Sequence, residues 1–212
     1  QNLDGFVSVF GVVKTCAVNL SKMCNDLRLL SSGPKTGIGE INLPARQNGS
    51  SIMPGKINPV IPEVVSQVAF NIIGHDYTIT MAAEAGQLEL NAFEPVIFYT
   101  LFESIETLGL AAQTLTEHCI LEITANEAHC KELVDASAGI ATALCPSIGY
   151  TAAATLAKKS LKTGVSVRKL AIEEGYVTEE EADKLLDPYA MTGKTTESEA
   201  EYATYKKVVN LG

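Results

Sequence analysis

The segment Gly49–Pro59 reads Gly-Ser-Ser-Ile-Met-Pro-Gly-Lys-Ile-Asn-Pro and concentrates side chains that could do chemistry. Its two hydroxyls, on Ser50 and Ser51, stand close in sequence to Lys56 and Asn58. Two glycines and an internal proline disfavour a regular helix, while the apolar residues between them argue against an idle solvent linker. We therefore predict a mobile loop that carries a nucleophile or base together with a cation.

This loop resembles the signature of the aspartase/fumarase superfamily, G-S-S-x-M-P-x-K-x-N, at every fixed position. The resemblance continues over nearly the whole chain, upstream at residues 25–34 and 39–41 and downstream at residues 58–65. Residues 81–91 are similar to the aspartase branch in particular, because fumarases usually carry Gly-Asn-Phe-Glu-Leu-Asn there. Superfamily members are much longer, so the resemblance implies a C-terminal portion of an enzyme whose other regions precede Gln1.

The resemblance implies a lyase that eliminates ammonia reversibly from L-aspartate to give fumarate, without an organic cofactor. It assigns the role of catalytic base to Ser50. Because a serine hydroxyl is a poor base in water, it would have to act as an alkoxide stabilised by backbone N–H groups and a nearby cation. A serine in a turn is the commoner role of a Gly-Ser-Ser sequence, but the complete motif favours the catalytic interpretation.

The other loop residues are interpreted as substrate-binding. Lys56 and Asn58 would hold a substrate carboxylate and stabilise the dianionic intermediate. Gly49 would let backbone donors approach, Ser51 would hold the substrate or the loop geometry, and Met53 would pack over the substrate. The simpler alternatives are a solvated lysine, an Asn-Pro turn and a methionine that fills a gap in the loop.

Glu63 is the second predicted catalytic residue. It follows Pro62 at the start of a predicted helix, where the helix dipole by itself favours an acidic side chain. By resemblance it would orient a histidine that this chain does not contain. In this family three subunits of a tetramer build each site, so we expect a homotetramer and an inactive isolated chain. His75 stands where relatives often have asparagine, and we expect it at a helix end or on the surface.

The composition narrows the range of partners. The chain has 16 basic and 25 acidic residues, a net charge of -9, and no cluster of lysines and arginines. Nucleic-acid binding is disfavoured, whereas a small dicarboxylate substrate needs only one local lysine. The five cysteines lack metal-type spacing, so no metal site is predicted. Cys16 and Cys24 lie in a helical pattern and are interpreted as buried, reduced thiols. We also expect no apolar run of membrane-spanning length and no signal peptide, which makes the cytoplasm the default location.

Long helices must position the loop. Over residues 3–30 apolar side chains recur at alternating spacings of four and three, as in a helix bundle. A second helix is predicted to open at Pro59, and a third to run from about Ala92 to about Glu122. These helices are so broadly apolar that they require further helices from elsewhere. The first stripe consists of Phe6, Phe10, Val13, Ala17, Leu20, Cys24 and Leu27.

The fold is therefore predicted to be all-α, with no strands. Residues 1–124 would form part of a central helical bundle that carries the loop, and residues 125–212 a small C-terminal helical domain. In the second domain the helices become short and polar, and Thr178 with Glu181 fits a capping box.

Two other functions remain open. Fumarate hydratase would use the same loop with water in place of ammonia, while argininosuccinate and adenylosuccinate lyases differ beyond the loop. A catalytically silent structural protein, like the lens crystallins of this superfamily, is the alternative from another class. The intact Ser50, Lys56 and Asn58 argue against silence, because a structural role would not require them.

Overall fold

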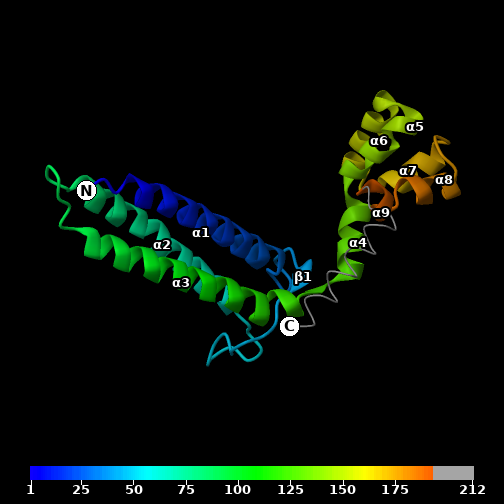
Figure 1. Ribbon diagram of the computed structural model, residues 1–212. Coiled ribbons are helices and arrows are strands. Elements are labelled where there is room, and N and C mark those ends of the chain that lie inside the picture. Colours follow the sequence, from blue (N-terminus) through cyan, green and yellow to red (C-terminus); the bar gives the residue numbers. More distant parts are fainter. Residues whose placement is uncertain (193–212) are drawn as a thin grey trace, which may run out of the picture. The chain divides into compact units, whose positions relative to one another are not determined.

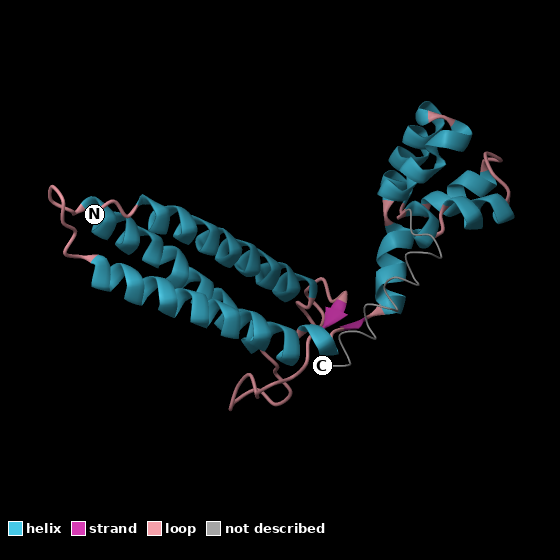
Figure 2. Cartoon of the chain, viewed as in Figure 1, coloured by secondary structure: helices cyan, strands magenta, loops and turns pink. Residues whose placement is uncertain are grey.

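The computed structural model describes residues 1–192 and consists mainly of helices (Figure 1 and Figure 2). This confirms the predicted all-α class with long helices and smaller C-terminal ones. Two compact units divide the chain, Gln1–Glu127 and a second unit that begins at Ala128. The functional division into domains 1–124 and 125–212 stays a prediction, and residues 193–212 lie outside the described part.

Three long helices make up most of the first unit, α1 (Asp4–Leu30), α2 (Val60–Glu84) and α3 (Glu94–His118). They lie side by side, with α2 packed against both of its neighbours (Figure 1). Phe10 and Ala17 of the predicted stripe are completely buried in this seam. The alternating spacing of apolar residues therefore identifies the buried face of α1 correctly.

The helix ends depart from the sequence prediction at one place. The third helix ends at His118, and a short 3-10 helix, η1 (Ile120–Glu122), replaces the predicted last turn. Cys119 between them has φ -137° and ψ -66°, which is outside the α-helical region. Gly74 does not interrupt α2, which continues to Glu84.

A small sheet contradicts the prediction that the chain has no strands. Strand β1 (Ile41–Asn42) pairs antiparallel with β2 (Thr124–Ala125). Two residues per strand are too few to show the period of two by which strands are recognised in a sequence. The pair lies where the long connection after α1 passes the end of α3, and it helps to fix the start of the predicted loop (Figure 2).

Helix α1 also corrects the expectation about membrane-spanning length. By length and composition it is apolar enough to cross a membrane, the one such helix among residues 1–192. The core helix of a soluble bundle passes the same test. Phe10 and Ala17 of α1 are buried against the other helices, and Lys14 pairs with Asp76 of α2 at 2.5 Å. Packing within the bundle therefore explains part of its apolar character.

The long helices keep a second apolar face that no other described residue covers. Val12 is 71% exposed and Tyr77 is 75% exposed, although both belong to otherwise packed helices. Large apolar side chains exposed in such number on neighbouring helices indicate an interaction surface. Other large apolar side chains exposed on these helices are Val9, Met23, Phe70, Met81, Tyr99, Phe102 and Leu110.

The second unit is built from short helices around its own core. Leu144, Leu156 and Val167 are completely buried there. The predicted capping box is confirmed, because Glu181 N–H donates to Thr178 Oγ1 at 3.2 Å and the Glu181 carboxylate accepts from Thr178 N–H at 2.9 Å. The described helices after the first unit's strands are α4 (Glu127–Ala136), η2 (Ala138–Ile140), α5 (Ala141–Ile148), α6 (Tyr150–Thr163), α7 (Val167–Glu173), α8 (Glu179–Leu185) and α9 (Pro188–Met191).

Candidate active-site loop

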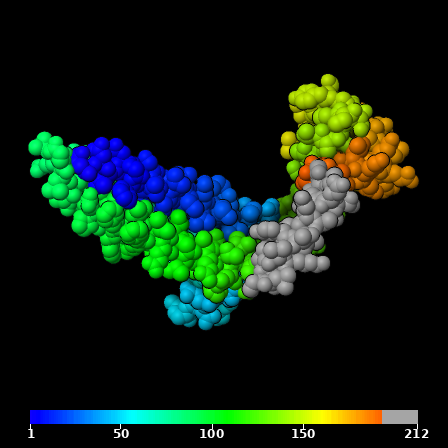
Figure 3. All heavy atoms as spheres, in the orientation of Figure 1, coloured from blue at the N-terminus to red at the C-terminus, as the bar shows by residue number. Residues whose placement is uncertain are grey.

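The signature segment forms a hairpin that projects from the bundle before the chain enters α2 (Figure 1 and Figure 3). Gly49 N–H donates to the carbonyl of Lys56 at 2.8 Å, and Asn48 and Ile57 form an antiparallel bridge. Gly55 has φ +78°, a left-handed conformation that glycine adopts without strain. The hairpin is therefore closed where it leaves the bundle, and there the chain segments that carry Ser50 and Lys56 run side by side.

Ser50 is half-buried and directly follows Gly49, where the hairpin is closed. Its Oγ accepts two backbone hydrogen bonds, from Ile52 N–H at 3.1 Å and from Met53 N–H at 3.2 Å. Two N–H dipoles that point at one oxygen stabilise negative charge on it. The same pattern also occurs around serines in ordinary turns. The geometry thus supplies the backbone donors that an alkoxide requires, while the role of Ser50 as the base stays a prediction.

Gly49 and Asn58 meet across the base of the hairpin. The Asn58 side-chain amide donates to the Gly49 carbonyl at 3.4 Å. A Cβ at position 49 would lie 2.8 Å from the Lys56 carbonyl oxygen and 2.9 Å from Asn58 Oδ1, closer than such contacts normally come. A glycine is therefore needed here for close packing. The predicted substrate contacts of Gly49 and Asn58 remain untested.

The remaining loop side chains face solvent. Within residues 1–192 the Lys56 ammonium has no ion-pair partner, and the Ser51 hydroxyl makes no hydrogen bond. Met53 is 51% exposed and Ile52 is 86% exposed. Apolar and cationic groups held in water at a loop tip are available to a ligand or another subunit. The predicted roles of Ser51, Met53 and Lys56 stay predictions.

Glu63 occupies the first turn of α2, as predicted. Its carboxylate lies 3.9 Å from a guanidinium nitrogen of Arg28, near the end of α1. This pairing could not be predicted from the sequence, because the two residues are far apart along the chain. In the described part of the chain no hydrogen bond joins the Glu63 carboxylate to the loop, so its catalytic role also remains a prediction.

The expectation for His75 is wrong. His75 lies in the middle of α2, half-buried, with Nδ1 2.9 Å from Ser104 Oγ of α3. Ser104 itself is completely buried, whereas the neighbouring Ile105 is 47% exposed. The sequence predicts the opposite, because Ile105 belongs to an apolar stripe of the third predicted helix with Ile97 and Leu101. The apolar period of the sequence does not indicate that the small polar Ser104 is buried. The packing of α3 in the structure shows that Ser104, and not Ile105, faces the core.

All five cysteines are free thiols. Cys24 is buried as predicted, but the prediction of a buried thiol at Cys16 is wrong, because Cys16 lies on the exposed side of α1. Burial raises the pKa of the Cys24 and Cys119 thiols, which keeps both protonated near neutral pH. Among the described residues no group of three histidine, cysteine or acidic side chains could hold a metal ion.

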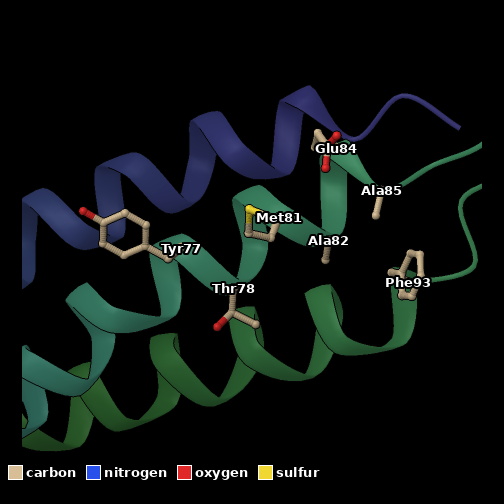
Figure 4. Close-up of a pocket in the computed structure, with 7 residues that line it drawn as sticks. All are labelled: Tyr77, Thr78, Met81, Ala82, Glu84, Ala85 and Phe93. Atoms are coloured by element: carbon tan, nitrogen blue, oxygen red, sulfur yellow. The ribbon is translucent and has the colours of Figure 1, made fainter.

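A shallow depression of about 560 Å³ lies at the far end of α2 from the loop (Figure 4). Tyr77 and Met81 of α2 line it together with Phe93, which precedes α3. At 1.5 Å per helical residue, it is roughly 30 Å along α2 from the loop. It belongs to the uncovered apolar face of the long helices and is separate from the candidate site.

Known proteins resemble this chain in sequence and structure. A family model described as Lyase matches residues 1–74, and one described as Fumarase C C-terminus matches residues 140–193. Aspartate ammonia-lyase from Pseudomonas canavaninivorans is 57% identical over 191 residues, which cover 90% of this chain and 40% of the relative. Aspartate ammonia-lyase from Bacillus subtilis is 50% identical over 91% of this chain and 40% of the relative.

Two solved structures have the same fold. The fumarate lyase:delta crystallin from Brucella melitensis bound to cobalt aligns with a TM-score of 0.84 and 50% identity, over 90% of this chain and 41% of that one. The recombinant class II fumarase from Schistosoma mansoni aligns with a TM-score of 0.81 and 37% identity, over 90% of this chain and 40% of that one.

The helical bundle, the signature loop and these matches together define a member of the aspartase/fumarase superfamily of lyases, to which this chain belongs. Its similarity to the aspartate ammonia-lyases within that superfamily, predicted from residues 81–91, is confirmed. The chain spans about 40% of the length of these curated relatives.

Proposed function

We propose that the full-length protein containing this chain is an aspartate ammonia-lyase, which converts L-aspartate reversibly to fumarate and ammonium. The observation that carries the proposal is the position of Ser50 Oγ, which accepts two backbone N–H bonds inside a complete signature loop. The identity of 50–57% to curated aspartate ammonia-lyases supports the choice of amine over other leaving groups.

The reaction begins with loss of a proton from the carbon beside the distant carboxylate of aspartate. Ser50, as an alkoxide stabilised by the N–H groups of Ile52 and Met53, takes this proton. The electron pair moves onto the carboxylate, which then carries two negative charges. Lys56 and Asn58 stabilise that dianion through a positive charge and an amide donor. Collapse of the dianion forms the double bond of fumarate and breaks the bond to ammonia.

Some of the site comes from outside this chain. Glu63 orients a histidine of another segment, while Gly49, Ser51 and Met53 shape or contact the substrate from the loop side. The exposed apolar faces of α1, α2 and α3 support a homotetramer, because faces of this kind are covered in stable assemblies. The partners proposed are thus a dicarboxylate and further copies of the chain, without nucleic acid or membrane. The five free thiols support a location in the cytoplasm.

Fumarate hydratase is the second candidate, favoured by the match of residues 140–193 to the Fumarase C C-terminus. The same loop can remove a proton from malate, with water as the leaving group. The choice between amine and hydroxyl depends on residues outside this chain, so substrate assays are needed to make it.

The deciding experiment assays the full-length protein on L-aspartate and L-malate side by side, following fumarate by its ultraviolet absorbance. We expect turnover of aspartate and far slower turnover of malate. Faster turnover of malate would establish fumarate hydratase instead. Residues 1–212 purified alone serve as a control and should show no turnover of aspartate. Measurable turnover by this piece would show that the site does not need the other regions.

A further inference from the structure

In the chain leading into the loop, Arg46 forms polar contacts with the end of α3 and with η1. Its Nε–H donates to the backbone carbonyl of His118 at 2.8 Å, and its Nη2 forms an ion pair and hydrogen bond with Glu122 of η1. The Arg46 side chain is 29% exposed to solvent, whereas the Glu122 side chain is 53% exposed. Arg46 is thus laid against the end of α3, although it belongs to a connection without regular structure.

The segment before Arg46 is also held in place. Asn126 N–H donates to the Glu40 carbonyl at 2.8 Å, and the Asn126 side chain donates to the Gly39 carbonyl at 2.7 Å. Asn42 of β1 donates to Asn126 Oδ1 at 2.7 Å. These bonds fix residues 39–42 beside β2, so the chain is already fastened to the end of the bundle when it reaches Arg46.

The segment after Arg46 is held differently. In the described part of the chain, hydrogen bonds of residues 47–57 connect loop residues with one another and with Asn58, and none reaches a helix. Ser50 stands four residues beyond Arg46. Among residues 1–192, Arg46 therefore makes the last hydrogen bonds and ion pair to the bundle before the candidate catalytic base, and α2 begins soon after the loop.

An arginine suits this position for two reasons. Its planar guanidinium can donate in two directions at once, to a backbone carbonyl and to a carboxylate, which the single ammonium of lysine does less well. The His118 carbonyl lies at the C-terminal end of α3, where the helix dipole attracts a cation. Exposed ion pairs contribute little to global stability, so the main effect of these contacts should be on where the loop stands.

We propose that Arg46 is a positioning residue, which pins the leading arm of the loop to the end of α3 through His118 and Glu122 and so fixes the place of Ser50. Arg46 acts through the loop and does not contact the substrate. The proposal rests on the proposed function of the loop, since it assigns to Arg46 the placement of the candidate base.

The test compares Arg46→Ala, Arg46→Lys and the charge exchange Arg46→Glu with Glu122→Arg in the full-length protein. Arg168→Ala is the matched control, because Arg168 makes ion pairs with Asp183 and Glu179 in the second unit. Arg46→Ala should lower kcat about tenfold or more, because small displacements of catalytic groups are costly, with a smaller change in KM. Arg46→Lys and the charge exchange should recover part of the loss.

Amide hydrogen exchange of residues 47–57 provides a second readout that does not need activity. Exchange there should rise in Arg46→Ala while exchange in α1 and α2 stays unchanged, and Arg168→Ala should alter neither this exchange nor kcat. A kcat within about twofold of wild type, unchanged loop exchange, or an equal loss in Arg168→Ala would overturn the proposal. If the wild-type protein turns over neither aspartate nor malate, the proposed function fails and loop exchange alone decides the role of Arg46.

Discussion

Ser50 in the loop and Thr178 in the second unit both accept backbone hydrogen bonds on a hydroxyl oxygen, but the segments that follow them differ. At Thr178 the donor is Glu181 N–H, helix α8 follows, and the Glu181 carboxylate bonds back to Thr178 N–H. At Ser50 the donors are Ile52 and Met53 N–H, and no helix begins within the hairpin. Pro54 and the left-handed Gly55 turn the chain back instead.

Hydrogen-bond donors at such a position stabilise an anion. Hydrogen bonds from the backbone N–H and the hydroxyl of Thr178 lower the pKa of the Glu181 carboxyl below its ordinary value. In the loop, backbone donors face the oxygen of Ser50, which would carry the negative charge of an alkoxide. The same local chemistry therefore stabilises a helix start in one place and, by our proposal, a base in the other.

Removing each hydroxyl in turn from the full-length protein tests whether the two have different roles. Ser50→Ala should lower kcat by about a thousandfold or more while KM changes little, because the lost group acts on the transition state. Thr178→Ala deletes an equivalent hydroxyl oxygen and should leave kcat within about twofold of wild type. Steady-state kinetics on aspartate measures both. A loss of less than about tenfold in Ser50→Ala would assign the base to another residue.

Lys56 supplies the cation of the same loop. Lys56→Ala should lower kcat/KM for aspartate about a hundredfold, since a positive charge aimed at the substrate carboxylate is lost. Lys158→Ala is the matched control, because Lys158 is an exposed lysine of α6 without an ion-pair partner in the described residues. Equal effects of the two substitutions on kcat/KM would show that Lys56 is only a solvated surface lysine.

Thr178 has a structural role at the start of α8. Thr178→Ala should reduce the opening free energy of α8 by about 1 kcal/mol, the usual contribution of an N-cap hydroxyl. Amide exchange of residues 179–185 in the full-length protein measures this change. Protection equal to that of wild type would mean that the Glu181 carboxylate alone is sufficient to hold the helix start.

The smallest expected effect is a pH dependence at Glu181. Because the folded pKa of Glu181 is lowered, its contribution is complete above the ordinary value of 4.5 and is lost as pH falls through the folded pKa. Glu181→Gln should therefore weaken the protection of α8 near neutral pH, and the difference from wild type should shrink toward about pH 4 and below. Amide exchange in both proteins measures it, and a difference independent of pH would exclude the carboxylate as its source.

Much of the fold follows from periodicity. The alternating stripe predicted α1 to within a residue of its start, and the capping box predicted the start of α8. Both signals are local, because the residues that produce them lie within a few turns of one another. The prediction failed where the partner is remote, as for β1 and β2, and for His75 and Ser104.

The candidate site divides in the same way. The motif singled out Ser50, Lys56 and Asn58, and the structure places all three in one hairpin. The motif could not show that Ser50 Oγ accepts two backbone donors, since that depends on the dihedral angles of the loop. It also could not show the pairing of Arg46 with Glu122, because the two residues are 76 positions apart and each is an ordinary charged side chain by itself.

The tight fit of Gly49 against Lys56 and Asn58 has a further consequence for mutagenesis. Even the methyl group of Gly49→Ala would act as a wedge between the two strands of the hairpin, at 2.8 Å from the Lys56 carbonyl oxygen. Such a variant would keep every reactive atom of the loop and still separate the serine segment from the lysine segment. Gly49→Ala could thus abolish the activity of the loop as completely as removal of the Ser50 hydroxyl. Its effect would come from the altered backbone geometry alone.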